Sequence, residues 1–282
     1  MHARIERVGF AILALVFVAL FALPVSLARA VPESWREDWC KDENEWSDHG
    51  GRACEVREVK LTATRGVLRV EPGQNGGVEV AAGTGPGLVV KARVEARSDT
   101  DAKARALLPT IRIVARDGYL SVAPESDLHD EGLTSKELKS VCVSFRIEAP
   151  ASLNLDLSTT NGPIGVTEMK SKMILASQNG PISLSRVGGE VLAEAQNGPM
   201  KVTLTGTRFE GKGLEARTKN GPAKLVLPKD YNATVEYGTL HGPWEGRIEQ
   251  VSDFRTTRLG KGGPPIAVTT ENGPYKLIRE DR

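Results

Sequence analysis

The side chains that could catalyse a reaction are few and scattered in this chain of 282 residues. A serine hydrolase needs a nucleophile in a sharp turn and a histidine partner. After residue 30 the histidines are His49, His129 and His241, and no Gly-x-Ser-x-Gly sequence is present. His241 replaces an asparagine in a repeated turn, which indicates a structural role. The sequence therefore predicts no nucleophile–histidine pair.

Carboxylates offer a second chemistry. A glycosidase needs two opposed carboxylates, and a polysaccharide lyase on a β-helix needs acidic metal ligands beside a basic residue. The carboxylates that would have to gather in one groove for such an enzyme are Asp156, Glu168, Glu190 and Glu194. The acidic loop at 127–132 could bind a cation, but adjacent residues of a polar loop seldom converge on one ion. We predict no catalytic residue, metal site or cofactor, with a polysaccharide-active enzyme as an alternative.

The first 30 residues have the features of a secretory signal peptide. Arg4 and Arg7 precede an apolar run at 8–27, and Ala28-Arg29-Ala30 offers a small-x-small cleavage site. The run is almost long enough to span a bilayer, so an uncleaved membrane anchor is the alternative. The chain is expected to be exported, to the periplasm, the outer-membrane surface or the extracellular space.

Cysteines and charge agree with export and narrow the choice of partners. Cys40 and Cys54 could close a small disulfide loop in an oxidising compartment. Cys142 lies in an alternating segment and is expected to be an unpaired strand thiol or to pair between molecules. Lysine plus arginine number 37 against 36 for aspartate plus glutamate, so no basic footprint for nucleic acid is present.

A repeated tripeptide dominates the second half of the chain. Asn-Gly-Pro occurs five times, with asparagines at Asn161, Asn179, Asn197, Asn220 and Asn272. The first two steps are 18 residues long, and apolar residues alternate before and after each turn. Alternation with period two indicates strands, so each repeat is two short strands joined at a corner. Asparagine and glycine both tolerate positive φ, which suits a sharp bend.

Two architectures fit such a repeat. The favoured one is a single-stranded β-helix, or solenoid, with coils of about 18 residues, in which each asparagine sits over its counterpart and forms an amide ladder. The alternative is an antiparallel β meander or sandwich, since Asn-Gly is also a hairpin turn. Either way the chain is expected to be all-β.

The remaining segments are predicted from composition and pattern. The expected divisions are a signal peptide at 1–30, a tryptophan-rich acidic arm or cap at 31–55, degenerate β coils at 56–150 and regular repeats at 151–282. One short helix is expected near 99–108, opened by Ser98 or Asp99 and closed before Pro109. The arm is expected to cover open strand edges, or alternatively to contact a partner through its tryptophans, Trp35, Trp39 and Trp46.

From about residue 54 onward the chain resembles a bacterial putative-adhesin family of unknown function. The run Cys54-Glu55-Val56-Arg57-Glu58, the Asn-Gly turns before alternating hydrophobic residues, and the late Gly262-Gly263-Pro264-Pro265-Ile266 carry the resemblance. It implies an exported, envelope-associated β-helix without an established catalytic centre. Proline after many Asn-Gly pairs departs from the family, where a second glycine or a β-former is common.

Together these features predict a non-catalytic exported envelope or surface protein, an adhesin-like scaffold whose partner is an envelope glycan or protein. An envelope-stress sensor that binds a peptide or lipid through the acidic arm is a further alternative. No nucleic-acid partner is expected, and a membrane is expected only if the leader stays uncleaved.

Overall fold

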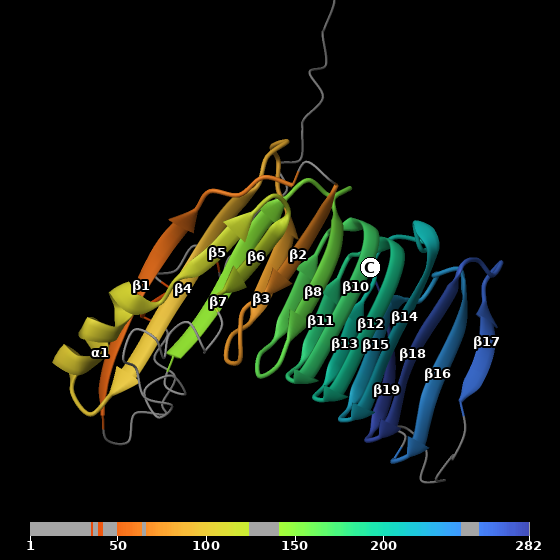
Figure 1. Cartoon of the computed structure of the whole chain (residues 1–282). Helices are drawn as coiled ribbons and strands as arrows, with labels where there is room; N and C mark the ends of the chain where they lie inside the picture. The colour runs from red at the N-terminus through yellow and green to blue at the C-terminus, as the bar shows by residue number, and fades with distance from the viewer. Residues whose placement is uncertain are drawn as a thin grey trace, which may run out of the picture.

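The computed structural model describes residues 35, 39–41, 50–63, 66–123, 141–243 and 254–281. The expected signal peptide, Trp46 and the acidic loop at 127–132 lie outside these residues. The regular secondary structure of the described residues is strand apart from one short helix and a 3₁₀ turn, and the strands form two large mixed sheets in which they lie side by side along one long axis (Figure 1).

The nine-stranded sheet is called sheet A. Its strands, in spatial order, are β1 (Gly51–Val59), β4 (Val89–Ser98), β7 (Val141–Ala149), β3 (Val78–Ala82), β9 (Ile164–Thr167), β11 (Ile182–Ser185), β13 (Met200–Thr203), β15 (Ala223–Pro228) and β19 (Tyr275–Glu280).

The ten-stranded sheet is called sheet B. Its strands, in spatial order, are β17 (Arg255–Leu259), β16 (Ala233–His241), β18 (Pro265–Asn272), β14 (Gly211–Asn220), β12 (Gly188–Asn197), β10 (Lys170–Asn179), β8 (Asn154–Thr159), β2 (Val67–Glu71), β6 (Tyr119–Val122) and β5 (Ile113–Arg116).

In the repeat region the chain crosses from one sheet to the other at every Asn-Gly-Pro. Strands β8 to β15 alternate between sheet B and sheet A, and neighbours within each sheet run parallel. The register matches the sequence repeat, since Asn179 pairs with Asn197 and Ile164 with Ile182. Two facing sheets also fit the sandwich alternative, but these neighbouring strands are parallel, whereas a meander would make them antiparallel.

The core lies between the two sheets. On β10 every second residue is buried, so Met173 and Leu175 point inward while Lys172 and Ile174 point outward. Leu184 and Val166 of sheet A are buried opposite them in the same cluster. Full burial of a Val, Leu, Ile or Met side chain contributes about 1.5–3 kcal/mol, so the alternation holds the sheets face to face.

The corners need glycine because the backbones of successive repeats approach closely. A Cβ atom on Gly180 would lie 2.1 Å from the carbonyl oxygen of Gly162, and one on Gly198 would lie 2.3 Å from that of Gly180. Positive φ does not explain the asparagines, because the non-glycine residues with positive φ in the described chain are Glu168 and Arg186. The expectation that asparagine serves a left-handed bend is therefore corrected.

Proline at the corner removes a backbone donor, and a hydroxyl replaces it. In the parallel register the missing N–H of Pro222 would face the carbonyl of Gly198, which instead accepts a bond of 2.7 Å from the Thr218 hydroxyl. The Thr270 hydroxyl does the same for Gly221, at 2.7 Å. At these two corners the missing backbone donor is thus replaced by a side-chain hydroxyl.

The first half departs from the expected coils. Strands β2 and β3 pair in parallel with β8 and β9, but β1, β4 and β7 pair antiparallel with one another, as do β5 and β6. The segment 56–150 is therefore not a run of degenerate coils. Its long alternating strands β4 and β7 satisfy each other's backbone groups directly, without a crossing between the sheets.

The short helix lies close to its expected position. Helix α1 covers Asp101–Leu107 and continues as a 3₁₀ turn, η2 (Leu108–Thr110), at Pro109. Its N-cap is Thr100, whose hydroxyl accepts a hydrogen bond from the Lys103 N–H, and neither Ser98 nor Asp99 has this role. The helix packs against β1 and β4. No helix in the described residues has the length and apolarity to cross a bilayer.

At the other end the order of strands differs from their order in the sequence. Strand β18 inserts between β14 and β16, so the last repeat lies next to Asn220, and His241 follows Asn272. Strand β17 pairs antiparallel with β16. The hairpin of β16 and β17 thus closes sheet B beyond the last Asn-Gly-Pro.

Candidate functional site

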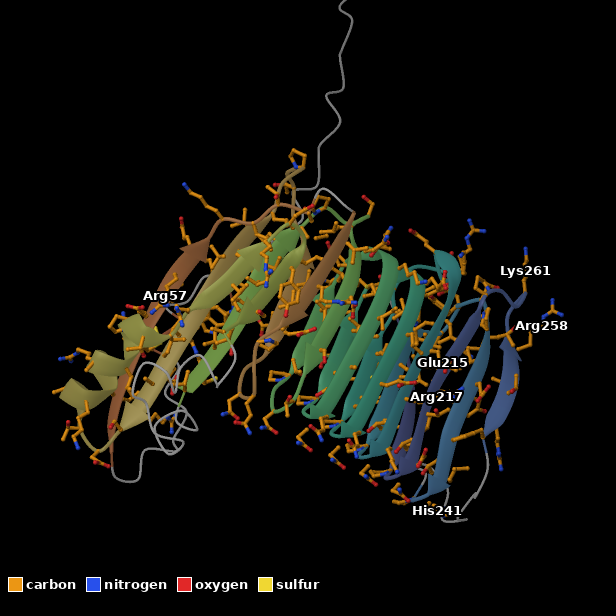
Figure 2. The ribbon with its side chains drawn as sticks, in the orientation of Figure 1. Arg57, Glu215, Arg217, His241, Arg258 and Lys261 are labelled. Atoms are coloured by element: carbon orange, nitrogen blue, oxygen red, sulfur yellow. A yellow bond between two sulfur atoms is a disulfide. The ribbon has the colours of Figure 1, made fainter. Side chains whose placement is uncertain are left out.

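An amide ladder runs along one corner of the molecule. The side-chain N–H groups of successive asparagines donate to the side-chain oxygens of their neighbours over 2.9–3.2 Å. Its members, in spatial order, are Asn75, Asn161, Asn179, Asn197, Asn220 and Asn272. The five predicted asparagines thus lie in one row, and Asn75 was missed because Gly76-Gly77 follows it where the others have Gly-Pro. His241 lies next to Asn272 at the end of this corner (Figure 2).

The described residues of the N-terminal arm before β1 include Trp35, Trp39 and Cys40, which contact the outer face of sheet A. Cys40 and Cys54 form a disulfide that ties the arm to β1. The Arg146 guanidinium lies 4.1 Å from the ring centre of Trp39 and 5.9 Å from that of Trp35. The expectation that the arm covers strand edges is corrected for these residues, because arginines on the sheet face hold the two rings through cation–π contacts.

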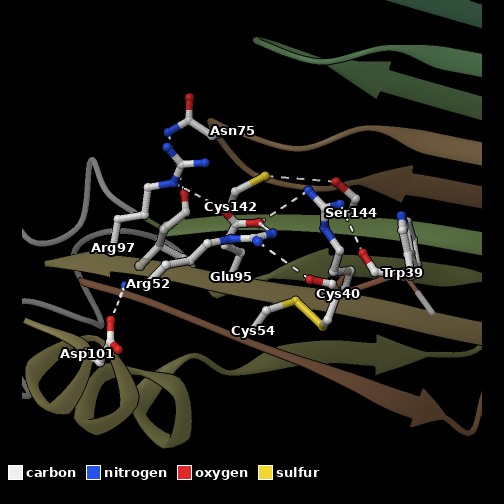
Figure 3. A network of polar contacts seen from close by, with 12 residues as sticks. Trp39, Cys40, Arg52, Cys54, Asn75, Glu95, Arg97, Asp101, Cys142 and Ser144 are labelled. Atoms are coloured by element: carbon white, nitrogen blue, oxygen red, sulfur yellow. Dashed lines mark hydrogen bonds and ion pairs between the residues drawn. A yellow bond between two sulfur atoms is a disulfide. The ribbon is translucent and has the colours of Figure 1, made fainter. Parts of the chain in front are cut away.

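Beneath the arm is a buried carboxylate surrounded by arginines. Glu95 of β4 pairs with Arg52 at 2.9 Å, Arg97 at 3.0 Å and Arg93 at 3.3 Å (Figure 3). Burial alone raises the pKa of the Glu95 carboxyl, but the hydrogen bonds from Arg52 and Arg97 outweigh it and lower the pKa below its ordinary value. Sequence reasoning missed this cluster, since its members come from β1 and β4, more than 40 residues apart.

Cys142 lies beside this cluster, opposite Glu95 in the register of β4 and β7. Its sulfur is 3.9 Å from the Ser144 hydroxyl (Figure 3), and burial raises the pKa of the thiol. Cys142 is the free cysteine of the described chain. A thiol with a raised pKa is a poor nucleophile at neutral pH, so the arrangement supports a structural role.

Three of the four carboxylates required by an enzyme are each paired with a cation. Asp156 contacts Arg69 at 2.6 Å, Glu168 contacts Arg186 at 2.8 Å and Glu190 contacts Lys212 at 2.8 Å. The hydrogen bond from Lys212 lowers the pKa of Glu190, the opposite of what a general acid requires. Glu168 follows β9 of sheet A, whereas the other three lie on sheet B.

An open depression of about 550 Å³ lies on the outer face of sheet B. Ile174 and Leu192 are exposed in its floor, with charged residues around them. Glu215 and Arg217 of β14, labelled in Figure 2, form an ion pair of 3.2 Å there. In the described chain no group of three histidine, cysteine, aspartate or glutamate residues is arranged to hold a metal ion.

The outer face of sheet A has a different character. Lys201, Lys224 and Lys276 occupy the same register position on β13, β15 and β19, so three like charges lie side by side. The sequence contains a signal for this row, since Asn-Gly-Pro-x-Lys occurs in the three corresponding repeats. The turns and the apolar alternation of the repeats do not depend on the outward positions, so they give no indication of this row.

Comparison with known proteins adds little at this level of similarity. No family model and no curated relative matches the chain. A solved structure of a putative cell adhesion protein from Clostridium sporogenes is 13% identical, with a TM-score of 0.39, and covers 81% of this chain and all of its own. A putative adhesin from Bacteroides fragilis is 13% identical, covers 81% of this chain and 97% of its own, and has a TM-score of 0.29.

A third structure, of a putative lipid binding protein from Parabacteroides distasonis, is 10% identical and covers 81% of this chain and 98% of its own, with a TM-score of 0.28. Scores this low carry no conclusion about the fold or the function of this chain.

Proposed function

We propose that the protein is a non-catalytic, exported envelope or surface protein, an adhesin-like β-solenoid that presents its outer faces to an envelope glycan or protein. The observation that carries the proposal is the register of the repeats, which places equivalent side chains in straight rows on two open faces. Such rows suit an extended partner better than a small substrate, which binding pockets enclose.

The Cys40–Cys54 disulfide supports export, because disulfides persist in oxidising compartments. The parallel crossings from sheet to sheet support the solenoid description of the repeat region, and the expected signal peptide supports delivery to the periplasm or beyond. The proposal includes the kind of partner, the absence of catalysis and the location.

The enzyme alternative is less well supported, because three of the four carboxylates it needs are paired with cations. The sensor alternative would use the tryptophan arm, but the rings of Trp35 and Trp39 already lie over arginines of the same chain. A contact through Trp46 stays a prediction, as this residue lies outside the described chain.

A binding and cleavage experiment tests the proposal. The full chain, exported by a bacterial host and purified from its envelope fraction, is mixed with isolated cell envelopes and with a panel of purified polysaccharides. We expect sedimentation with at least one of these, without new reducing ends or unsaturated sugars. Cleavage that disappears in Glu190→Gln but persists in Glu271→Gln would establish the enzyme instead. Loss of sedimentation in Trp46→Ala, with an unchanged melting temperature, would favour the sensor.

A further inference from the structure

The lysine row on sheet A is unusual for a β-sheet surface. Lys201, Lys224 and Lys276 lie on adjacent parallel strands, which places their backbones about 4.8 Å apart. Like charges directly opposite each other on neighbouring strands destabilise a sheet. The structure gives Lys201 and Lys224 no carboxylate partner within the described residues, so nothing there offsets the repulsion between these two.

Sheet B, built from the same repeats, has no such row. Its exposed cations face carboxylates on neighbouring strands, as Arg69 faces Asp156 and Lys212 faces Glu190. Glu194 likewise lies opposite Arg217 in the register of β12 and β14. The same coils therefore carry paired charges on one face and, at Lys201 and Lys224, two adjacent lysines without a carboxylate partner among the described residues on the other. The repeat alone cannot explain the difference.

The rows beside the lysines have a definite chemistry. Lys201 and Thr203 are outward positions of β13, and the exposed Pro199 directly precedes this strand, so a proline row flanks the lysines on one side. The prolines, all exposed, are Pro163, Pro181, Pro199, Pro222 and Pro274. On the other side, Thr203 and Ser185 lie in register and provide hydroxyl groups.

This combination fits one class of ligand. Sugar rings present C–H groups that the apolar faces of pyrrolidine rings can cover, their hydroxyls can bond with threonine and serine, and carboxylates along the polymer can pair with the lysines. A linear polymer lying across the strands would meet a new proline and a new outward side chain at each strand. Figure 1 shows β11, β13, β15 and β19 side by side in the order that such a chain would cross.

We propose that the outer face of sheet A over β11, β13, β15 and β19 binds an anionic polysaccharide that carries a carboxylate on successive sugars. The inference rests on the proposed function and specifies the ligand class and the binding face. The lysine row supplies charge complementarity, and the proline row supplies the apolar surface for the rings. Electrostatic attraction of this kind weakens as salt rises.

The test measures binding of the full chain to three polymers by biolayer interferometry, at low and high salt. The polymers are polygalacturonate as the anionic polysaccharide, dextran as a neutral one and long-chain polyphosphate as a non-sugar polyanion. The site variant is Lys201→Gln with Lys224→Gln. The matched control is Lys172→Gln with Lys219→Gln, which removes the same charge from the outer face of sheet B.

We expect the wild type to bind polygalacturonate in a salt-dependent manner and to bind dextran weakly. The site variant should lose affinity by about tenfold, which corresponds to about 1.4 kcal/mol, while the control variant keeps it. Because the lysines are exposed or half-buried and repel each other, the site variant should melt no lower than the wild type, so lost binding would not reflect unfolding.

Other outcomes overturn the proposal in different ways. Equal losses in the two double variants would place binding elsewhere, and stronger binding to polyphosphate than to polygalacturonate would make the ligand a phosphate polymer. Equal binding to dextran would remove the role of charge. Failure to bind polygalacturonate, with sedimentation on cell envelopes intact, would refute this inference and leave the proposed function standing.

Discussion

The amide ladder makes a quantitative prediction about Asn197. Its side chain donates to Asn179 over 2.9 Å and accepts from Asn220 over 2.9 Å, so Asn197→Leu removes two hydrogen bonds. A typical hydrogen bond contributes about 0.5–1.5 kcal/mol net. Because all three asparagines are exposed and water can replace part of each bond, we expect a loss of about 1–2 kcal/mol. For a chain of this size that is a fall of roughly 2–8 °C in melting temperature.

The assay is thermal unfolding followed by far-ultraviolet circular dichroism, repeated with urea. The matched control is Gln196→Leu, an amide-to-leucine change at the preceding residue, which is also exposed and has no bond in the ladder. It should change stability by less than about 0.5 kcal/mol. Lys201→Ala on the same repeat should also do little. If Asn197→Leu and Gln196→Leu have the same melting temperature, the ladder contributes nothing to stability and the reasoning fails.

Three more predictions concern the corners, the buried carboxylate and the disulfide. Ala195 occupies the register position at which the neighbouring strands have the hydroxyls of Ser177 and Thr218. The serine hydroxyl of Ala195→Ser should donate to the Gly180 carbonyl and stabilise the fold by about 0.5–1.5 kcal/mol. Ala193→Ser, in the apolar core, should destabilise the fold. Urea unfolding distinguishes the two, and a destabilised Ala195→Ser would contradict the corner mechanism. The lowered pKa of Glu95 contributes stability above the ordinary carboxyl pKa, and this is lost as pH falls through the folded value. Glu95→Gln should therefore reduce the fall in melting temperature at acid pH. If the melting temperature of the variant falls as steeply as that of the wild type, other groups cause the acid sensitivity. Reduction of the Cys40–Cys54 disulfide opens the loop that it closes, and in the chain-entropy model this should lower the free energy of unfolding by about 3 kcal/mol. The measurement is the urea midpoint with and without reductant, and equal midpoints would refute the prediction.

The two outer faces show how one repeat supports different surfaces. Most inward positions of the repeats are apolar because they pack against the facing sheet, and the corner glycines are required by the close approach of the next repeat. Outward positions have neither restriction. The fold therefore permits, but does not require, the paired charges on sheet B and the lysines on sheet A.

The sequence by itself determined the features that depend on local pattern. Alternating apolar residues gave the strands of the repeats and their inward faces, and the recurrence of Asn-Gly-Pro located the corners. Thr100 rather than Ser98 caps the helix, since adjacent residues with similar side chains compete for one cap and only the backbone path selects among them.

Only the tertiary structure decided what depends on pairing between distant segments. Backbone hydrogen bonding does not distinguish parallel from antiparallel neighbours by residue type, so the antiparallel group of β1, β4 and β7 and the insertion of β18 beside β14 left no sign in the alternation. The arginines around Glu95 and the adjacent lysines of sheet A likewise meet through register, which sets neighbours across strands that lie 20 or more residues apart in the chain.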